Sequence, residues 1–138
     1  MNSTDLLNFL TSRKWQICRS IVDNKYSHTF LFVGEGCFSF KNSQWIYFES
    51  GQLVFNNNIY NSYRRYIYEP CTDNVIERFE DGRFFYSIEC NQLPHAIFYH
   101  ICIFDFYSGS LLVQKESWKM TWHVQGPNKD TILISEFS

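Results

Sequence analysis

Alanine is nearly absent from this sequence, in which Ala96 is the single alanine among 138 residues. Alanine is the best helix former, so its scarcity argues against a helical domain. Aromatic residues make up 20% of the chain, with 14 Phe and 9 Tyr, and aromatic side chains favour strands. The composition therefore predicts an all-β fold, and the length predicts a single domain over residues 1–138.

Excess positive charge, cysteine pairs and long apolar runs are also missing. The formal net charge is −2, so we expect no nucleic-acid partner. Five cysteines without a C-x-x-C pair indicate reduced thiols and a cytoplasmic protein, not a disulfide framework or a zinc ribbon. The chain opens without a signal-peptide pattern, and no run reaches the about 18 apolar residues of a membrane helix. We expect no membrane span, no metal and no cofactor.

Strand and turn signals predict a meander of eight to ten antiparallel strands after a short helix within residues 1–14, which Ser3, Thr4 and Asp5 would cap. The expected strands are residues 17–22, 30–40, 44–49, 52–55, 58–69, 75–80, 83–89, 95–107, 111–124 and 131–137. The expected turns lie at residues 50–51, 56–58, 81–82, 108–109 and 126–128. Because closure removes exposed edges, we expect residues 15–138 to form an antiparallel up-and-down β-barrel.

Two glycines stand among four phenylalanines in the segment F-L-F-V-G-E-G-C-F-S-F, residues 30–40. Gly34 and Gly36 share a face with the phenylalanines on a regular strand. Glycine at such positions suits a sharp bend where another backbone comes close. The segment therefore predicts one of the bent strands that a barrel requires.

The most unusual polar residues, His100, Cys102, Asp105 and Tyr107, lie in the apolar segment of residues 95–107. A buried polar group without a partner costs roughly 2–7 kcal/mol, so these side chains need partners. On a regular strand the first two and the last two face opposite sides, and one bulge near residue 103 would bring all four to one side. We predict such a bulge and a single polar cluster facing the interior.

Three interpretations of this cluster stay open: a satisfied core network, a ligand pocket, and a catalytic site. A nucleophilic dyad of Cys102 and His100 is excluded because residues two apart on a strand are about 6.6–7 Å apart. The histidines and cysteines also lack a diagnostic metal-binding spacing. Acid–base chemistry by His100 or Asp105 with Tyr107 is compatible with the shifted pKa values of buried groups.

Arg64 and Arg65 alternate within the strand pattern of residues 62–68. We expect one of them to point inward, where it would suit Asp105 or an anionic ligand. Trp118 and Trp122 share another face and are expected to fill the barrel or to line a pocket. The turn of residues 126–130 would place Lys129 at one mouth of the barrel.

Several motifs resemble the uncharacterised domain-of-unknown-function family 6314 of small, mainly bacterial proteins. The family pattern is H-x-C-x-x-D-x-Y followed by W-x-V-x-G-P-x-K-D, and F-E-D-G-R-F-F and R-R-Y-I-Y add to the likeness. The matching residues are His100, Cys102, Asp105, Tyr107, Trp122, Val124, Gly126, Pro127, Lys129 and Asp130. This chain departs from the family at Ile103, where members tend to have Gly. The resemblance implies a calycin-like (lipocalin-like) barrel and no established activity.

The leading hypothesis for function is binding of a small apolar or amphipathic molecule inside the barrel. The expected ligand-binding residues are His100, Cys102, Asp105, Tyr107, Arg64, Arg65, Tyr66, Trp118, Trp122, Phe32, Phe38 and Lys129. One alternative is an isomerase- or hydratase-like enzyme that uses the same cluster. The other is a protein-interaction module with a filled core. The ligand and the oligomeric state stay open, with a homodimer among the options.

Overall fold

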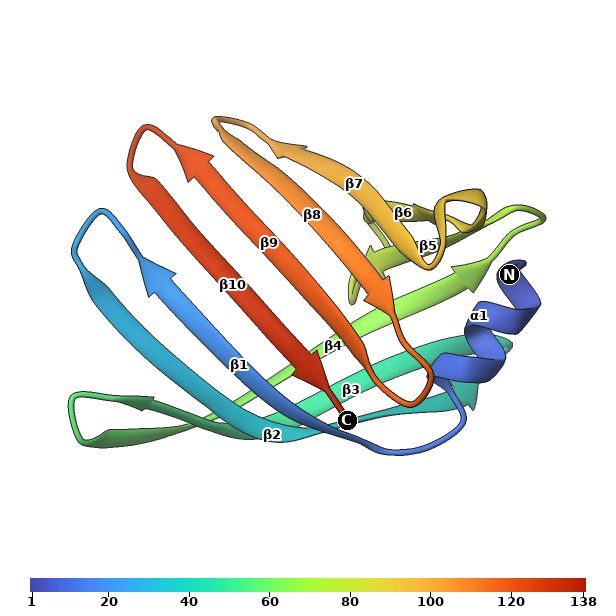
Figure 1. Cartoon of the computed structure of the whole chain (residues 1–138), viewed down its shortest axis with the longest axis horizontal. Coiled ribbons are helices and arrows are strands. Elements are labelled where there is room, and N and C mark those ends of the chain that lie inside the picture. The colour runs from blue at the N-terminus through green and yellow to red at the C-terminus, as the bar shows by residue number, and fades with distance from the viewer.

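The computed structural model describes all residues, 1–138, as one helix and ten strands in a curled sheet (Figure 1). The helix is α1 (Ser3–Leu10), and a short 3-10 turn spans Cys90–Gln92. The strands are β1 (Trp15–Asp23), β2 (His28–Lys41), β3 (Gln44–Phe55), β4 (Asn58–Pro70), β5 (Asn74–Phe79), β6 (Phe84–Glu89), β7 (His95–Cys102), β8 (Asp105–Val113), β9 (Trp118–Gly126) and β10 (Lys129–Phe137).

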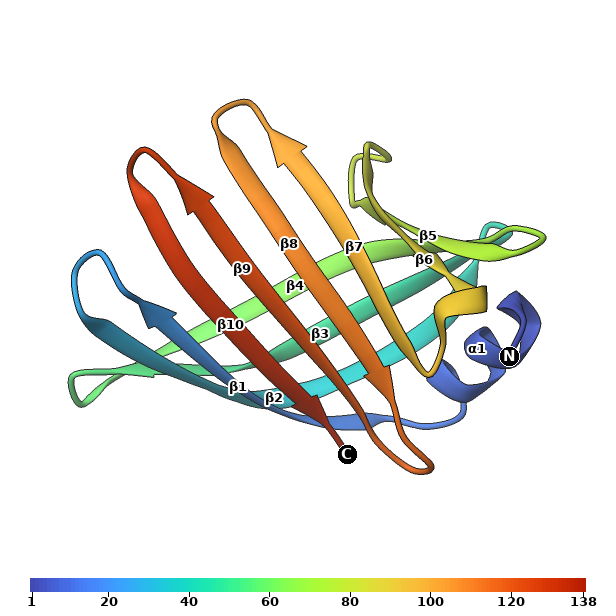
Figure 2. The ribbon, with the colours of Figure 1, turned by 45° about the horizontal axis from the view of Figure 1, so that its top comes forward.

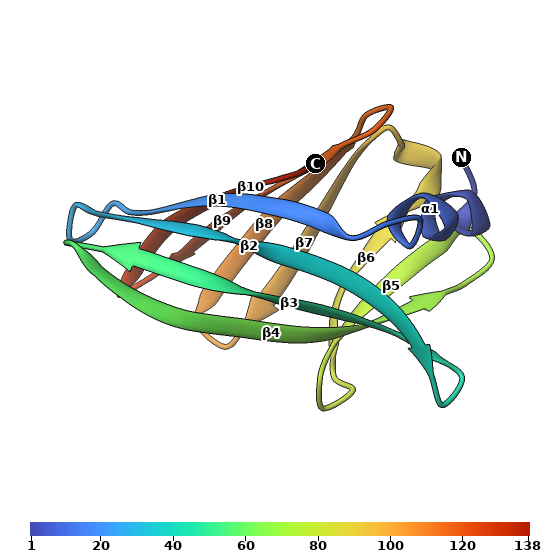
Figure 3. The ribbon, with the colours of Figure 1, turned by 90° about the horizontal axis from the view of Figure 1, so that it is seen from below.

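All strands form one antiparallel sheet in the order β6-β5-β4-β3-β2-β1-β10-β9-β8-β7. The first and last strands of the chain therefore meet, with Arg19 of β1 opposite Ser135 of β10. Strands β6 and β7 lie at the two ends of this order, and the rings of Tyr86 and Phe98 stack between them with centroids 4.3 Å apart. These side chains bridge the seam. The ribbon curls until β6 and β7 approach each other (Figure 3), and the predicted calycin-like antiparallel barrel is confirmed.

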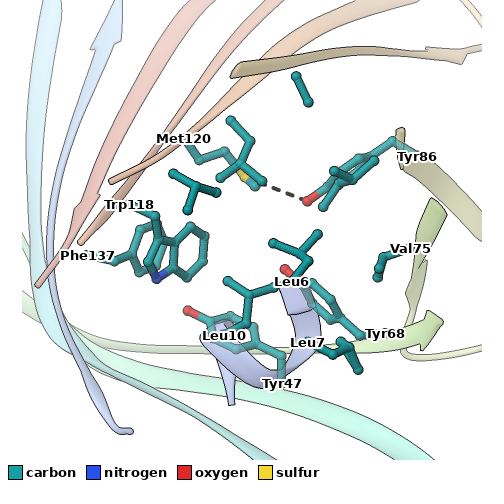
Figure 4. Packing of buried hydrophobic residues seen from close by; sticks show 14 of the residues in the cluster. Leu6, Leu7, Leu10, Tyr47, Tyr68, Val75, Tyr86, Trp118, Met120 and Phe137 are labelled. Carbon is teal, nitrogen blue, oxygen red and sulfur yellow. Dashed lines mark hydrogen bonds between the residues drawn. The ribbon is translucent and has the colours of Figure 1, made fainter. Parts of the chain in front are cut away.

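Helix α1 covers one end of the barrel, and the turns that join β1 to β2, β3 to β4, β7 to β8 and β9 to β10 lie away from it (Figure 2). The helix begins with a capping box, in which the Asn2 side chain accepts a hydrogen bond from the Asp5 amide and the Asp5 side chain accepts one from the Asn2 amide. Leu6, Leu7 and Leu10 are buried against the barrel interior (Figure 4). The expected helix is present, with Asn2 as its cap. No helix is long and apolar enough to span a membrane.

Two expected turns lie inside strands. Residues 50–51 are part of β3, and residues 108–109 are part of β8. Gly51 faces Gly34 of β2, where a Cβ atom on Gly34 would lie 2.9 Å from the Gly51 Cα and 2.3 Å from the Ser50 carbonyl oxygen. Glycine at this crossing permits the close backbone approach that was predicted for Gly34. Gly51 lies within a strand and does not form the expected turn.

Two expected strands are in fact broken by turns. The segment 95–107 is a hairpin of β7 and β8, and the predicted bulge is replaced by a turn at residues 103–104, with Ile103 at φ 53°. The segment 111–124 is divided between β8 and β9 by residues 114–117. The other expected turns are present, at residues 56–57, 81–82 and 127–128.

Candidate functional site: an internal cavity with a buried charge network

A cavity of about 220 Å³ lies inside the curled sheet. Its lining consists of mostly apolar and aromatic side chains, interrupted by a few charged ones. The lining residues are Arg19, Tyr47, Glu49, Arg64, Tyr66, Tyr68, Glu77, Phe79, Phe85, Tyr107, Trp118, Met120, Trp122, Val124, Leu133, Ser135 and Phe137. Pockets for drug-sized ligands have volumes of about 300–1,000 Å³, so this cavity suits a smaller molecule.

A buried ion pair of Arg19 and Glu49 lies in the cavity wall. Arg19 Nη1 and Nη2 donate to the two carboxylate oxygens of Glu49 at 2.6 and 3.0 Å, and Arg19 Nε donates to Ser135 Oγ at 2.6 Å. Phe32 packs beside this pair, with the guanidinium carbon 5.1 Å from its ring centroid. The bidentate geometry holds both charges in fixed positions.

Glu49 also accepts hydrogen bonds from the Tyr47 hydroxyl at 2.8 Å and from Arg64 Nε at 3.2 Å. Burial alone would raise the pKa of Glu49, but the bonds from Arg19 and the charge of Arg64 outweigh it and lower the pKa to about 2. Gly36 faces Glu49 across β2 and β3, and a Cβ there would lie 2.5 Å from the Tyr47 hydroxyl. The glycine therefore leaves room for the Tyr47–Glu49 bond.

Arg64 points inward and Arg65 outward, as the alternation of a strand requires. Arg64 lies directly opposite Glu49 in the register of β3 and β4, and its Nη1 donates to the Tyr66 hydroxyl at 3.3 Å. The inward arginine therefore pairs with Glu49 and not with Asp105. Arg65 lies 3.8 Å from Glu80 on the exterior.

A second carboxyl group, that of Glu77, is 4% exposed and also lines the cavity. Burial is the main influence on its pKa and raises it to about 7, although the hydroxyls of Tyr68 and Tyr86 act in the opposite direction. Trp118 Nε1 is the buried side-chain donor that has no hydrogen-bond partner. No group of three His, Cys, Asp or Glu side chains could hold a metal ion.

The four residues predicted to form one cluster are spread over the β7–β8 hairpin. In its register His100 faces Tyr107 and Cys102 faces Asp105. Only Tyr107 lines the cavity, because the His100 ring packs on Phe85 at 5.1 Å and Cys102 is exposed. The structure therefore does not form the expected cluster, and a ligand-binding role of these residues stays a prediction.

Asp105 and Lys129 join two hairpin turns at the end of the barrel away from α1. Lys129 Nζ lies 3.3 Å from Asp105 Oδ2, and this bond is the main reason that the pKa of Lys129 is raised. A Cβ on Gly126 would lie 2.0 Å from Asp105 Oδ1, so glycine leaves room for this carboxylate where the two turns meet. Lys129 thus lies at the expected mouth, with Asp105 as its partner.

The predicted wall residues divide into two groups. Tyr66, Trp118 and Trp122 line the cavity, while Phe32 and Phe38 pack in the core behind it. Arg19, Glu49 and Glu77 line the cavity although none of them was predicted as a site residue. Their signal was a single charged residue at an alternate position of an otherwise inward-facing apolar series, such as Trp15, Ile17 and Arg19.

Comparison with solved structures finds similarity to a structure titled "Structure of S-type Phycobiliprotein Lyase CPES from Guillardia theta". The TM-score is 0.73 at 7% sequence identity, over 99% of this chain and 92% of that chain. At this identity the similarity shows the fold alone. No curated protein matches the chain.

The sequence motifs and the barrel agree with a family model. The model described as "Family of unknown function (DUF6314)" matches residues 11–138. This chain therefore belongs to the DUF6314 family.

Proposed function

We propose that this protein binds a small, largely apolar ligand in the cavity of the barrel. The observation that carries the proposal is a cavity of about 220 Å³ that combines aromatic walls with a few fixed polar groups. Ligand sites in proteins have this composition, in which apolar walls give affinity and the polar groups give orientation. An interaction module with a filled core would leave no such space.

The unpartnered indole N–H of Trp118 adds support. Trp118 is 2% exposed and lines the cavity, and its Nε1 has no acceptor within the chain. A buried donor without an acceptor costs about 1–3 kcal/mol, and an acceptor atom on a ligand would remove this cost. Trp118→Phe should therefore weaken ligand binding, and it should also lower the stability of the ligand-free protein because Trp118 packs on Phe137 in the core.

Native mass spectrometry of protein purified from its own host tests the proposal directly, because it reports a bound mass. Leu133→Phe adds volume to a residue of the cavity wall, and Ile134→Phe is the matched control on the opposite face of β10. We expect the bound mass to disappear in the first variant and to persist in the second. A wild-type protein without any bound compound would contradict ligand binding.

The ligand class is inferred from the cavity and not from the name of the solved neighbour. That name, a phycobiliprotein lyase, describes a protein with 7% identity to this chain. A cytoplasmic location and a homodimer remain predictions.

A proton-transfer enzyme, such as an isomerase or a hydratase, is a second candidate because of two carboxyl groups in one cavity. Glu49 has a pKa of about 2, while burial raises the pKa of Glu77 to about 7. Such separated values suit one permanent anion and one acid or base that works near neutral pH. In D₂O, an enzyme of this kind should incorporate deuterium into the host-derived ligand. Loss of this incorporation in Glu77→Gln would support an enzyme. Binding without exchange would favour a carrier.

A further inference from the structure

Arg64 has hydrogen-bonding capacity that the chain does not use. A guanidinium carries five N–H donors, and Arg64 directs Nε to Glu49 and Nη1 to Tyr66. Its Nη2 has no hydrogen-bond partner within the chain. The Glu49 carboxylate already accepts bonds from Arg19 and Tyr47 as well as Arg64. Nη2 is therefore free to bind a group that comes from outside the chain.

The Tyr66 hydroxyl supplies a second donor at the same place. It accepts the bond from Arg64 Nη1 at 3.3 Å, so its own proton is available, and no acceptor in the chain takes it. Tyr66 and Arg64 are two residues apart on β4, face the same side, and both line the cavity. Two donors that converge on one space, one of them on a cation, suit an anionic acceptor.

The charges around this space leave Arg64 incompletely balanced. Two cations of the cavity wall, Arg19 and Arg64, share the single low-pKa carboxylate of Glu49. Glu77 has a pKa of about 7 and is mostly neutral below that pH. About one positive charge is thus unmatched at pH 6.

Arg64 also reaches the outside of the barrel. Its side chain is 39% exposed, and it borders an outer depression together with Arg65 and Arg83. Those two arginines have acidic neighbours, Glu80 at 3.8 Å and Asp81 at 2.7 Å. The unmatched positive charge therefore lies at Arg64, between the cavity and solvent.

We propose that the ligand is an amphipathic monoanion, whose carboxylate binds Arg64 and Tyr66 and whose apolar body lies in the cavity against Phe85 and Trp122. A planar carboxylate matches the guanidinium fork, and one negative charge matches the one unbalanced positive charge. The aromatic walls offer the apolar body a surface of stacked rings, with Phe85 and Trp122 centroids 5.2 Å apart. This inference rests on the function proposed above and adds the chemical class of the ligand.

Three probes with one apolar body test the class of the head group: naphthalene-2-carboxylate, 2-naphthylmethanol and 2-naphthylmethylammonium. Calorimetric titration at pH 6 should show the carboxylate binding wild type about tenfold or more tighter than the alcohol, and the ammonium weakest. Arg64→Gln should bring the carboxylate and the alcohol to equal affinity. Arg65→Gln, the neighbouring arginine on the outer face, should keep the wild-type preference.

Tyr66→Phe tests the same site if Arg64→Gln does not fold, because Tyr66→Phe leaves the Arg64–Glu49 pair in place. It should weaken the carboxylate about threefold or more and leave the alcohol unchanged. Equal binding of carboxylate and alcohol by wild type would overturn the anionic ligand and leave ligand binding intact.

If none of the three probes binds, the compound released from host-purified protein decides. A monoanion supports the inference. A neutral or cationic compound overturns the inference but leaves the proposed function intact. Protein without any bound compound overturns the proposed function and the inference together.

Discussion

Replacing Glu77 by Gln should stabilise the protein at pH 8 and change its stability little at pH 5. Glu77 is 4% exposed, and burial raises its pKa from 4.5 to about 7. The folded state therefore holds a proton that the unfolded state releases between these values. The contribution of the neutral acid is fully present below about pH 4.5 and is lost as the pH rises through 7. Gln is neutral throughout and has no such loss.

The size of the effect follows from the shift in pKa. The difference between about 7 and 4.5 is about 2.5 units, and each unit corresponds to about 1.4 kcal/mol, which gives about 3 kcal/mol by pH 8. A domain of this length changes its Tm by roughly 3 °C per kcal/mol, so Glu77→Gln should melt roughly 10 °C higher than wild type at pH 8. Glu49 does not interfere, because its pKa of about 2 makes its contribution constant above about pH 4.5.

Urea denaturation at pH 5, 6, 7 and 8 measures this difference. The wild-type curve should fall relative to that of Glu77→Gln as the pH rises, with most of the separation developing between about pH 4.5 and 7 and little further change above 7. Glu116→Gln, at an exposed position, controls for the loss of a carboxylate as such and should follow wild type. Parallel curves for wild type and Glu77→Gln would refute the inference that Glu77 is ionised at a cost inside the barrel.

Two further substitutions test the network and the hairpin by urea denaturation. Glu49→Gln leaves Arg19 buried without its counter-ion and should destabilise the protein by about 3–5 kcal/mol. The control Glu35→Gln removes a carboxylate from an exposed ion pair and should cost at most about 1 kcal/mol. Equal losses of stability in the two variants would contradict the buried pair. Ile103→Gly should stabilise the protein by about 0.5–1 kcal/mol, because Ile103 has φ 53° and is 84% exposed. The control Phe104→Gly should not stabilise it. A loss of stability in Ile103→Gly would contradict the strained turn.

The strands of the barrel could be predicted because polar turn residues mark most of their ends. Asn56 and Asn57 both have positive φ, at 49° and 65°, which asparagine tolerates and which matches the twist of a two-residue hairpin. The turn at residues 103–104 has no such marker. Ile103 and Phe104 are both strand formers, so the apolar pattern of β7 continues into β8 without interruption. Neither residue indicates the positive φ that Ile103 has there.

The turn predicted at Ser50-Gly51 was wrong for a different reason, because glycine has more than one structural use. In Asp81-Gly82 it has a positive φ of 92° and makes a turn, whereas in Ser50-Gly51 it lets β2 and β3 approach closely. The two uses look alike in a sequence, because both place a glycine after a small or polar residue. They differ in the partner strand, which only the register of the sheet defines.

The charged network could not be predicted for the same reason. Arg19, Glu49 and Arg64 come from β1, β3 and β4, and each is a lone charged residue on the inward face of its strand. A lone charged residue indicates a burial cost that some partner must offset, but the partner is fixed by which strands adjoin. Arg64 and Glu49 meet because the turn at residues 56–57 sets the register of β3 and β4. The interior polar cluster was instead predicted in segment 95–107, because polar residues are concentrated there. That segment forms a hairpin at the seam.

The family motif contributes to both the frame and the cavity. Along β8 and β9 the alternation of a strand directs Tyr107, Trp122 and Val124 into the cavity. At the turns of the same two hairpins, Asp105 and Lys129 bind each other at 3.3 Å. The ladder between β8 and β9 sets the relative position of these three wall residues, and the partly exposed ion pair adds at most about 1 kcal/mol beside the turns. Loss of the pair should therefore leave the barrel folded and the cavity walls in place, because the two turns lie at the end away from α1 and the core contacts of the helix are unaffected.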